Sequence, residues 1–124
     1  MQVKCGIDII EINRIKESIE DLNDKFLNRV YTQKEIEYCE SKGMSKYEHY
    51  AARFAVKEAA YKAIYENLKD KFQIGWKNIE TINDKFGRPK VKISGVNTNN
   101  IENIDVSISH CREYATASVV ILFN

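Results

Sequence analysis

Glu58 and Lys62 are the residues whose types and spacing first suggest chemistry. They are four positions apart, so on a helix their side chains lie on one face. One interpretation is a surface ion pair worth about 0.3–0.5 kcal/mol. The other is a carboxylate that binds a divalent metal, beside a lysine that neutralises phosphate oxygens. Arg53 and Lys57 have the same spacing, and because like charges so placed repel, they mildly favour a shared anionic partner.

A metal site needs a second carboxylate, and Asp8 is the candidate. It stands among Ile7, Ile9 and Ile10 in a segment with the alternation of a strand, where aspartate is unfavourable. An edge position or a satisfied hydrogen bond would explain it, and so would metal coordination. The residues alone leave these alternatives open.

A third candidate, His110, follows Ser107-Ile108-Ser109 at the expected end of a strand. Ser109 and His110 do not form a nucleophile–base pair, because adjacent residues on a strand point to opposite faces. A lone histidine is more often structural, but one at a strand end beside a cationic site can bind phosphate.

The elements that must position these residues follow from periodicity and capping. Strands are expected over 2–12, 76–82, 90–94, 104–109 and 114–123, with a turn at Gly87-Arg88-Pro89. Helices are expected over 14–22, 24–30, from the capping box Thr32-Gln33-Lys34-Glu35 to about residue 40, and over 47–69. This order predicts an α+β fold: a single domain over 1–124, with a mainly antiparallel sheet packed against a long central helix.

The 47–69 helix has two different faces. One half carries only small residues, which suit close packing on a sheet: Ala51, Ala52, Ala55, Val56, Ala59, Ala60 and Ala63. The other half mixes charges with large aromatic rings. This mixture predicts a second surface, partly covered by other chain or by a ligand.

Composition excludes several function classes. The net charge of +1 gives no global field for nucleic acid or an anionic membrane. No P-loop, dinucleotide-binding glycine motif or His-Glu-x-x-His is present. The three cysteines have no metal-ligand spacing, and Lys4, Asp8 and Glu11 interrupt any N-terminal apolar region. We therefore expect a cytoplasmic protein with reduced thiols.

Several short motifs, in order along nearly the whole chain, resemble one family. They are Gly6-Ile7-Asp8-Ile9-Ile10-Glu11 with Arg14-Ile15; Phe26, Arg29 and Tyr31-Thr32-Gln33-Lys34-Glu35; Ala52-Arg53-Phe54-Ala55-Val56-Lys57-Glu58-Ala59 with Lys62-Ala63; and Trp76, Ile79-Glu80, Gly87-Arg88-Pro89 and Ser107-Ile108-Ser109-His110. The chain is similar to the holo-acyl-carrier-protein synthases, the short bacterial class of 4′-phosphopantetheinyl transferases.

This resemblance implies an activity and a set of partners. The enzyme would transfer 4′-phosphopantetheine from coenzyme A to a serine hydroxyl of apo acyl carrier protein, a reaction of fatty acid biosynthesis, releasing adenosine 3′,5′-bisphosphate. It would use Mg²⁺ and form a homotrimer with sites between subunits, with no nucleic acid or membrane partner.

The resemblance also implies roles for individual residues. Asp8 and Glu58 would bind Mg²⁺, and with Lys62 they would form the catalytic group. Lys62 would face the pyrophosphate, while Arg53 and His110 would bind nucleotide phosphates, the 3′-phosphate in particular. The base that takes the serine proton is either Glu58 or a metal-bound water.

The chain departs from the family pattern at three places, one of which is Cys111, after His110, where threonine is common. Lys4 stands where the family often has glycine, and Tyr65-Glu66-Asn67-Leu68-Lys69 lacks the usual glycine turn after the long helix. The lost turn is compatible with a second hypothesis, a non-catalytic trimeric binding module, although intact Asp8, Glu58 and Lys62 argue against it. A third, a purely structural domain, leaves Asp8 unexplained.

Overall fold

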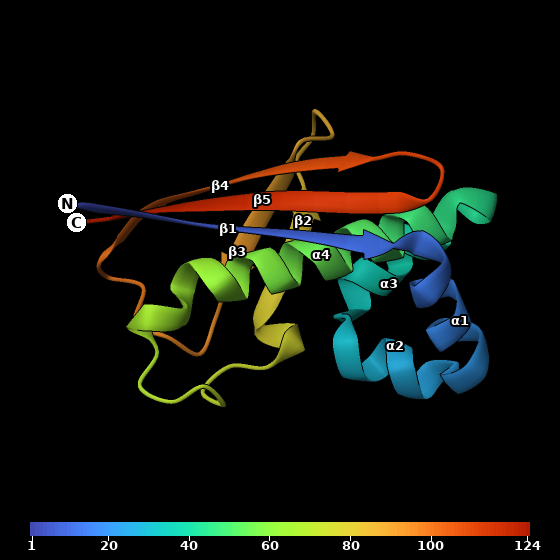
Figure 1. Cartoon of the computed structure of the whole chain (residues 1–124), viewed down its shortest axis with the longest axis horizontal. Helices are drawn as coiled ribbons and strands as arrows, with labels where there is room; N and C mark the ends of the chain where they lie inside the picture. Colours follow the sequence, from blue (N-terminus) through green and yellow to red (C-terminus); the bar gives the residue numbers. More distant parts are fainter.

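The computed structural model, which describes residues 1–124, places one long helix against an antiparallel sheet (Figure 1). The three-stranded sheet has the order β1-β5-β4, and a second, two-stranded sheet pairs β2 with β3. The strands are β1 (Gln2–Glu11), β2 (Ile79–Asn83), β3 (Pro89–Ile93), β4 (Ile101–His110) and β5 (Tyr114–Phe123). The α-helices are α1 (Ile12–Leu22), α2 (Asp24–Val30), α3 (Gln33–Glu40) and α4 (Lys46–Ile64). The predicted α+β fold is confirmed, with the strands divided between two sheets.

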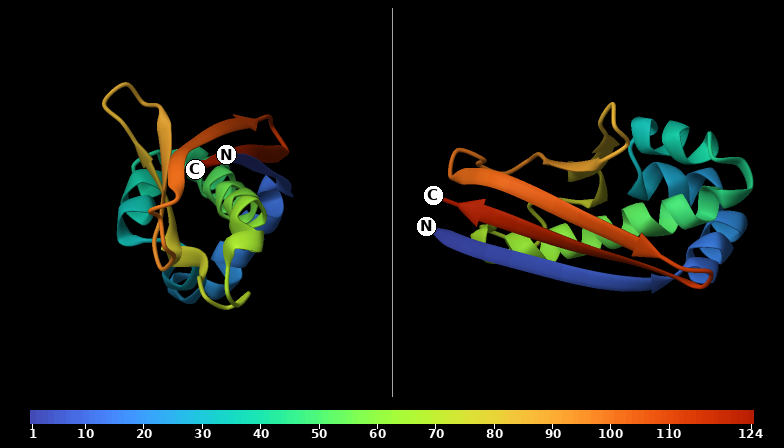
Figure 2. Two further views of the ribbon diagram at one scale, coloured as in Figure 1. Left: turned by 90° about the vertical axis from the view of Figure 1, so that its left-hand side faces the viewer. Right: turned by 90° about the horizontal axis from the view of Figure 1, so that it is seen from above.

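Helix α4 lies along the inner face of the β1-β5-β4 sheet, while α1, α2 and α3 gather at one end (Figures 1 and 2). All seven small residues of its predicted packing face are buried. The opposite half is also largely covered, because Tyr50, Lys57 and Ile64 are at most 1% exposed. The predicted second surface therefore exists, and α3 and β2 of the same chain cover much of it.

Strand β1 is an edge strand whose apolar residues, apart from Ile10, face away from the core. Ile7 and Ile9 are each 65% exposed, whereas Gly6 is buried and Asp8 is half-buried. The Lys4-Gly6-Asp8-Ile10 face lies toward α4, with Asp8 opposite Ala117 of β5. The alternation correctly predicts a strand, but the more hydrophobic face points outward. Asp8 is thereby directed at the helix.

Glycine at position 6 permits a close contact between β1 and α4. A Cβ there would lie 2.0 Å from the backbone carbonyl oxygen of Ala59 and 2.9 Å from Cβ of Lys62. The first distance is far below van der Waals contact, so only glycine fits without moving the strand or the helix. The segment containing Asp8 is thus held against the turn of α4 that carries Lys62.

Local signals predicted α3 and the β2–β3 turn. The Thr32 hydroxyl accepts a hydrogen bond from the Glu35 backbone N–H at 3.3 Å, and a Glu35 carboxylate oxygen accepts one from the Thr32 backbone at 3.0 Å. The expected capping box is therefore confirmed. Gly87 has φ of 81°, a left-handed conformation that suits glycine in the predicted turn.

The predicted 47–69 helix was too long. Helix α4 ends at Ile64, and a 3₁₀ turn follows over Tyr65–Asn67. Glu66 in that turn forms an ion pair with Lys4 of β1. Two of the departures from the family pattern therefore contact each other, since Lys4 replaces one glycine and Glu66 lies where the glycine turn is absent.

Two strand boundaries also differ from expectation. Residues 76–78 form a 3₁₀ turn rather than the start of β2, and β4 begins at Ile101, three residues before the expected strand over 104–109. Neither difference changes the pairing, because β4 and β5 form the predicted antiparallel hairpin. No helix combines the length and the apolar character needed to cross a bilayer.

We predict that Gly6→Ala lowers the free energy of unfolding by about 1–3 kcal/mol, the usual cost of overpacking a close contact. Urea denaturation followed by circular dichroism measures the effect. Cys5→Ala is the matched control, because Cys5 is exposed on the outward face of the same strand. Equal stabilities for the two variants would contradict a close contact at Gly6.

Candidate active site

Asp8, Glu58 and Lys62 come together where β1 crosses α4. The Lys62 ammonium donates a hydrogen bond to the Ile7 carbonyl oxygen at 2.8 Å and lies 3.5 Å from Asp8 Oδ1. Glu58 is one helical turn before Lys62 on α4. The lysine contacts the strand rather than forming the helical ion pair with Glu58, so the surface ion-pair interpretation of this spacing is wrong. Asp8 does occupy an edge strand, as one structural alternative proposed, yet its side chain is turned inward.

The two carboxylates repel each other. Burial raises the pKa of Glu58 above its usual value, and the Asp8 carboxylate raises it further, while Lys62 acts in the opposite direction. Lys62 therefore does not cancel the combined effect of burial and of the Asp8 charge on the pKa of Glu58. Such a pair of carboxylates favours additional positive charge between its members.

A divalent cation fits this donor set. No cluster of three or more histidine, cysteine, aspartate or glutamate side chains exists in the chain, so Asp8 and Glu58 are the acidic ligands available at this point. Mg²⁺ is commonly held by one or two carboxylates, with water and substrate phosphate completing its octahedral shell. The donors match that requirement, and the repulsion acting on Glu58 would be relieved by the ion.

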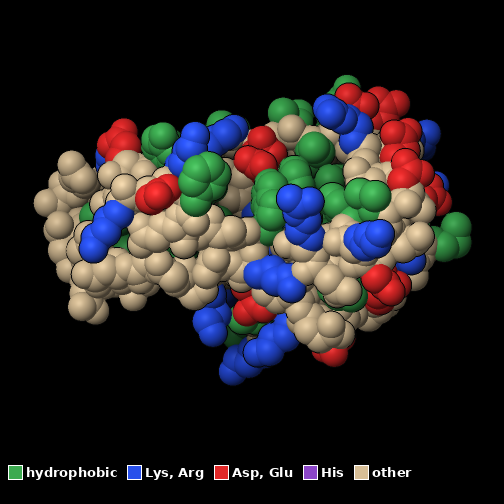
Figure 3. All heavy atoms as spheres, turned by 90° about the horizontal axis from the view of Figure 1, so that it is seen from below, with side chains coloured by type: hydrophobic (Ala, Val, Ile, Leu, Met, Phe, Trp, Pro, Cys, Tyr) green, Lys and Arg blue, Asp and Glu red, His purple; other side chains and the backbone are tan.

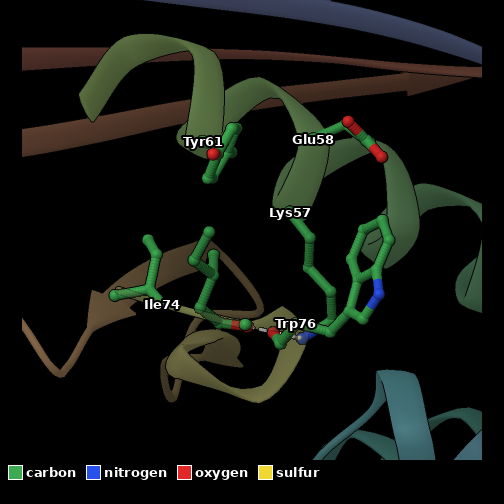
Figure 4. A pocket seen from close by; sticks show the side chains of 7 residues that line it. Lys57, Glu58, Tyr61, Ile74 and Trp76 are labelled. Atoms are coloured by element: carbon green, nitrogen blue, oxygen red, sulfur yellow. Dashed lines mark hydrogen bonds between the residues drawn. The ribbon is translucent and has the colours of Figure 1, made fainter. Parts of the chain in front are cut away.

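A partly apolar pocket of about 230 Å³ opens beside Glu58 (Figure 4). It is lined by Lys57, Glu58, Tyr61, Ile74, Gly75, Trp76 and Ile79. The indole of Trp76 stacks on Phe54 of α4, with ring centroids 5.0 Å apart. The site thus combines a charged cluster with an adjoining apolar wall, an arrangement typical of small-molecule sites.

Arg53 lies inside the protein rather than beside the two carboxylates. It is 3% exposed, its guanidinium donates to Asn83 Oδ1 at 2.6 Å, and it lies 4.0 Å from the centre of the Tyr38 ring. Its Nε has no hydrogen-bond partner. These contacts connect α4 to β2 and α3. A role in binding nucleotide phosphate stays a prediction.

His110 stands at the opposite end of α4 from Glu58. Its Nδ1 is 3.6 Å from Glu48 Oε2, and its ring is 6.4 Å from that of His49. Glu48 precedes Glu58 by ten residues, or about 15 Å along a helix. Within a single chain, His110 therefore does not lie beside the Asp8 and Glu58 carboxylates. Its expected contact with a phosphate stays a prediction.

Sequence reasoning missed a buried ion pair on the far side of α4. Lys57 and Glu35 are both 0% exposed, and Lys57 Nζ lies 2.7 Å from Glu35 Oε1. Burial lowers the pKa of the Lys57 ammonium, while Glu35 opposes that change. Arg53 and Lys57 therefore have separate partners within the chain, and the expectation that they share an anion is wrong. The capping box at Glu35 was visible in the sequence, but nothing local indicated its partner 22 residues away.

Comparison with known proteins identifies the family of the chain. A family model described as the 4′-phosphopantetheinyl transferase superfamily matches residues 4–119. The holo-[acyl-carrier-protein] synthase of Ruminiclostridium cellulolyticum is 44% identical, over 98% of this chain and 92% of its own length. The chain belongs to the 4′-phosphopantetheinyl transferase superfamily. The family resemblance inferred from the motifs is confirmed.

Solved structures of family members share the fold. A holo-(acyl-carrier-protein) synthase from Bacillus anthracis, in complex with CoA (3′,5′-ADP), is 37% identical with a TM-score of 0.76, covering 95% of this chain and 94% of its own. The Helicobacter pylori synthase in complex with coenzyme A is 30% identical with a TM-score of 0.82, covering 95% and 99%. Coenzyme A is therefore a ligand of family members with this fold.

We predict that Asp8→Asn lowers the pKa of Glu58, because it removes the neighbouring negative charge. The pKa should stay above the ordinary glutamate value, since burial, the larger cause, persists. A raised pKa means that Glu58 loses its charge at a higher pH than usual during acidification, and a shared cation would be released there. Carbon-13 NMR titration of the Glu58 carboxyl, in metal-free buffer, measures the shift. An unchanged pKa would show that the two carboxylates do not interact.

Proposed function

We propose that this protein transfers the 4′-phosphopantetheine group of coenzyme A to a serine hydroxyl of an apo acyl carrier protein, releasing adenosine 3′,5′-bisphosphate. The observation that carries the proposal is the meeting of Asp8, Glu58 and Lys62 beside an apolar pocket, in a chain of this superfamily. In the transfer the serine oxygen forms a bond to the β-phosphorus, and the bond from that phosphorus to the bridging oxygen breaks.

The charged and apolar residues of the chain would have different roles in this reaction. Lys62, oriented by the Ile7 carbonyl and Asp8, would face the pyrophosphate and offset its negative charge. Asp8 and Glu58 would hold Mg²⁺, which supplies charge neutralisation and polarises the attacked phosphorus. The pocket along Tyr61, Ile74 and Trp76 suits the less polar pantetheine arm. Glu58 is the chain's own group that would take the serine proton.

A homotrimer would complete the site. The outward face of β1 and β5 exposes Val3, Ile7, Ile9 and Val120, a group of apolar side chains of the kind that subunit contacts cover. His110 lies at the far end of α4 from Glu58. A neighbouring subunit would bring its own His110 to the Asp8–Glu58 cluster, which explains why one chain does not.

The surface of this chain that would contact the carrier protein carries both acidic and basic side chains. Helix α1 carries basic Arg14 and Lys16 in its first half, followed by acidic Glu17, Glu20 and Asp21. Figure 3 shows acidic and basic side chains side by side over the helical end of the molecule. A mixed surface steers an acidic partner less strongly than a basic one, so we expect association to depend weakly on salt.

The decisive assay incubates the protein with coenzyme A, Mg²⁺ and apo acyl carrier protein, and measures the intact mass of the carrier. We expect the mass of one phosphopantetheine group to be added.

Glu58→Gln should lower the rate by at least about 100-fold while leaving the melting curve intact, since it removes both a ligand and a candidate base. Lys62→Ala should weaken the use of coenzyme A. A carrier that never gains mass, with an intact coenzyme-binding signal, would instead support the non-catalytic binding module.

Subunit complementation tests the trimer and the shared site together. Glu58→Gln and His110→Ala should each be impaired alone, whereas co-expressed, doubly tagged mixtures should recover activity. In a three-fold ring that contains both variants, about one site in three regains an intact Glu58 from one subunit and an intact His110 from its neighbour. Light scattering should show three chains per particle. Mixtures no more active than the separate variants would rule out a site shared between subunits.

A further inference from the structure

Lys57 has all three of its N–H donors used inside the protein. Its ammonium donates to Glu35 Oε1 at 2.7 Å, to the Trp76 carbonyl oxygen at 3.0 Å and to the Ile79 carbonyl oxygen. A lysine ammonium has three donors, so no capacity is left for a ligand. The role of Lys57 is therefore confined to the interior, where it binds backbone carbonyl groups rather than substrate.

Glu35, the acidic partner, is equally occupied. Besides Lys57, its two carboxylate oxygens accept the backbone N–H groups of Thr32 and Thr81 at 3.0 Å each. The pair therefore connects the start of α3, the middle of α4 and strand β2. With both side chains fully buried, charge and hydrogen bonding are balanced within this cluster.

The two carbonyl groups held by Lys57 belong to the wall of the pocket beside Glu58. Trp76 and Ile79 both line that pocket, opposite the α4 residues Glu58 and Tyr61. Figure 4 shows Lys57 reaching from α4 toward the backbone at Trp76, while Glu58 turns away from it. The length of the lysine stem thus sets the separation between the wall and the helix that carries Glu58.

We propose that Lys57, paired with Glu35, is a positioning residue that fixes the 76–79 segment as the wall of the coenzyme pocket. The expected change in kinetics rests on the proposed function, whereas the expected change in the position of the 76–79 segment does not. The wall contacts a part of the coenzyme that does not react. Its displacement weakens binding of substrate and transition state alike, so it raises KM and leaves kcat nearly unchanged.

The principal variant combines Glu35→Gln with Lys57→Met. It removes both charges together, because loss of Lys57 alone would leave a buried carboxylate without its cation. Methionine fills a similar volume without a donor, so the carbonyl groups of Trp76 and Ile79 lose their shared partner. Lys57→Arg is the second variant: it keeps the positive charge opposite Glu35, but its planar guanidinium cannot reproduce the three-directional donation.

Trp76 is the only tryptophan of the chain, so its fluorescence reports the wall directly. In the folded variants we expect a red-shifted emission and stronger quenching by acrylamide. Val56→Ala is the matched control, because it loosens the core from the sheet side of α4 and leaves the wall bonds intact. Unchanged emission in the folded variants, or an equal shift in Val56→Ala, would overturn the proposal.

Steady-state kinetics supply the second readout. KM for coenzyme A should rise by about 3–10-fold in the double variant, with kcat within about two-fold of the wild type. Lys57→Arg should show a smaller rise in the same direction. A folded double variant with unchanged KM would refute the positioning role while leaving the transferase function intact. If the wild type transfers no phosphopantetheine, the proposed function fails, and Trp76 fluorescence still decides the position of the wall.

Discussion

The close contact between β1 and α4 at Gly6 is the constraint on which the candidate site depends. Only a residue without a Cβ allows the strand to lie against the Ala59 carbonyl. Two residues later, Asp8 is carried toward the helical turn that holds Lys62. The small side chains of α4 serve the same end on the helix side, because they let the sheet approach along the whole length of the helix.

The opposite side of α4 is held by polar interactions rather than by small residues. The Glu35–Lys57 pair and the Arg53–Asn83 hydrogen bond connect the helix to α3 and β2. Breaking one half of a buried ion pair usually costs about 3–5 kcal/mol, because the remaining charge has no partner. The helix is therefore fixed on both sides, by steric fit toward the large sheet and by directed hydrogen bonds toward the small one.

This division explains why neighbouring residues of one helix have different roles. Lys57 and Glu58 are adjacent, but the first is sealed in the interior and the second lies on the rim of a pocket. The helical rotation of about 100° per residue separates them, so a buried lysine and a half-buried carboxylate at a pocket can follow each other along one helix. Rigid elements carrying a site in this way hold it more accurately than loops do.

Sequence alone determined much of this protein. Periodicity and capping predicted the α+β class, the small-residue face of α4 and the start of α3, because these depend on contacts a few residues apart. Short motifs at consistent separations indicated the family and singled out Asp8, Glu58 and Lys62. The end of α4 was placed five residues late, because no glycine or proline marks the 3₁₀ turn Tyr65–Asn67 that follows it.

Only the tertiary structure decided which way charged residues face and what they contact. The apolar alternation of β1 gave no sign that Ile7 and Ile9 point outward, because periodicity specifies two faces without saying which one is buried. Arg53 and Lys57 looked like partners for one anion, yet each bonds a separate group brought to it by folding. Glu58 and Lys62 looked like an ion pair, but the Lys62 ammonium pairs with Asp8, which lies 54 residues away on a strand packed against the helix.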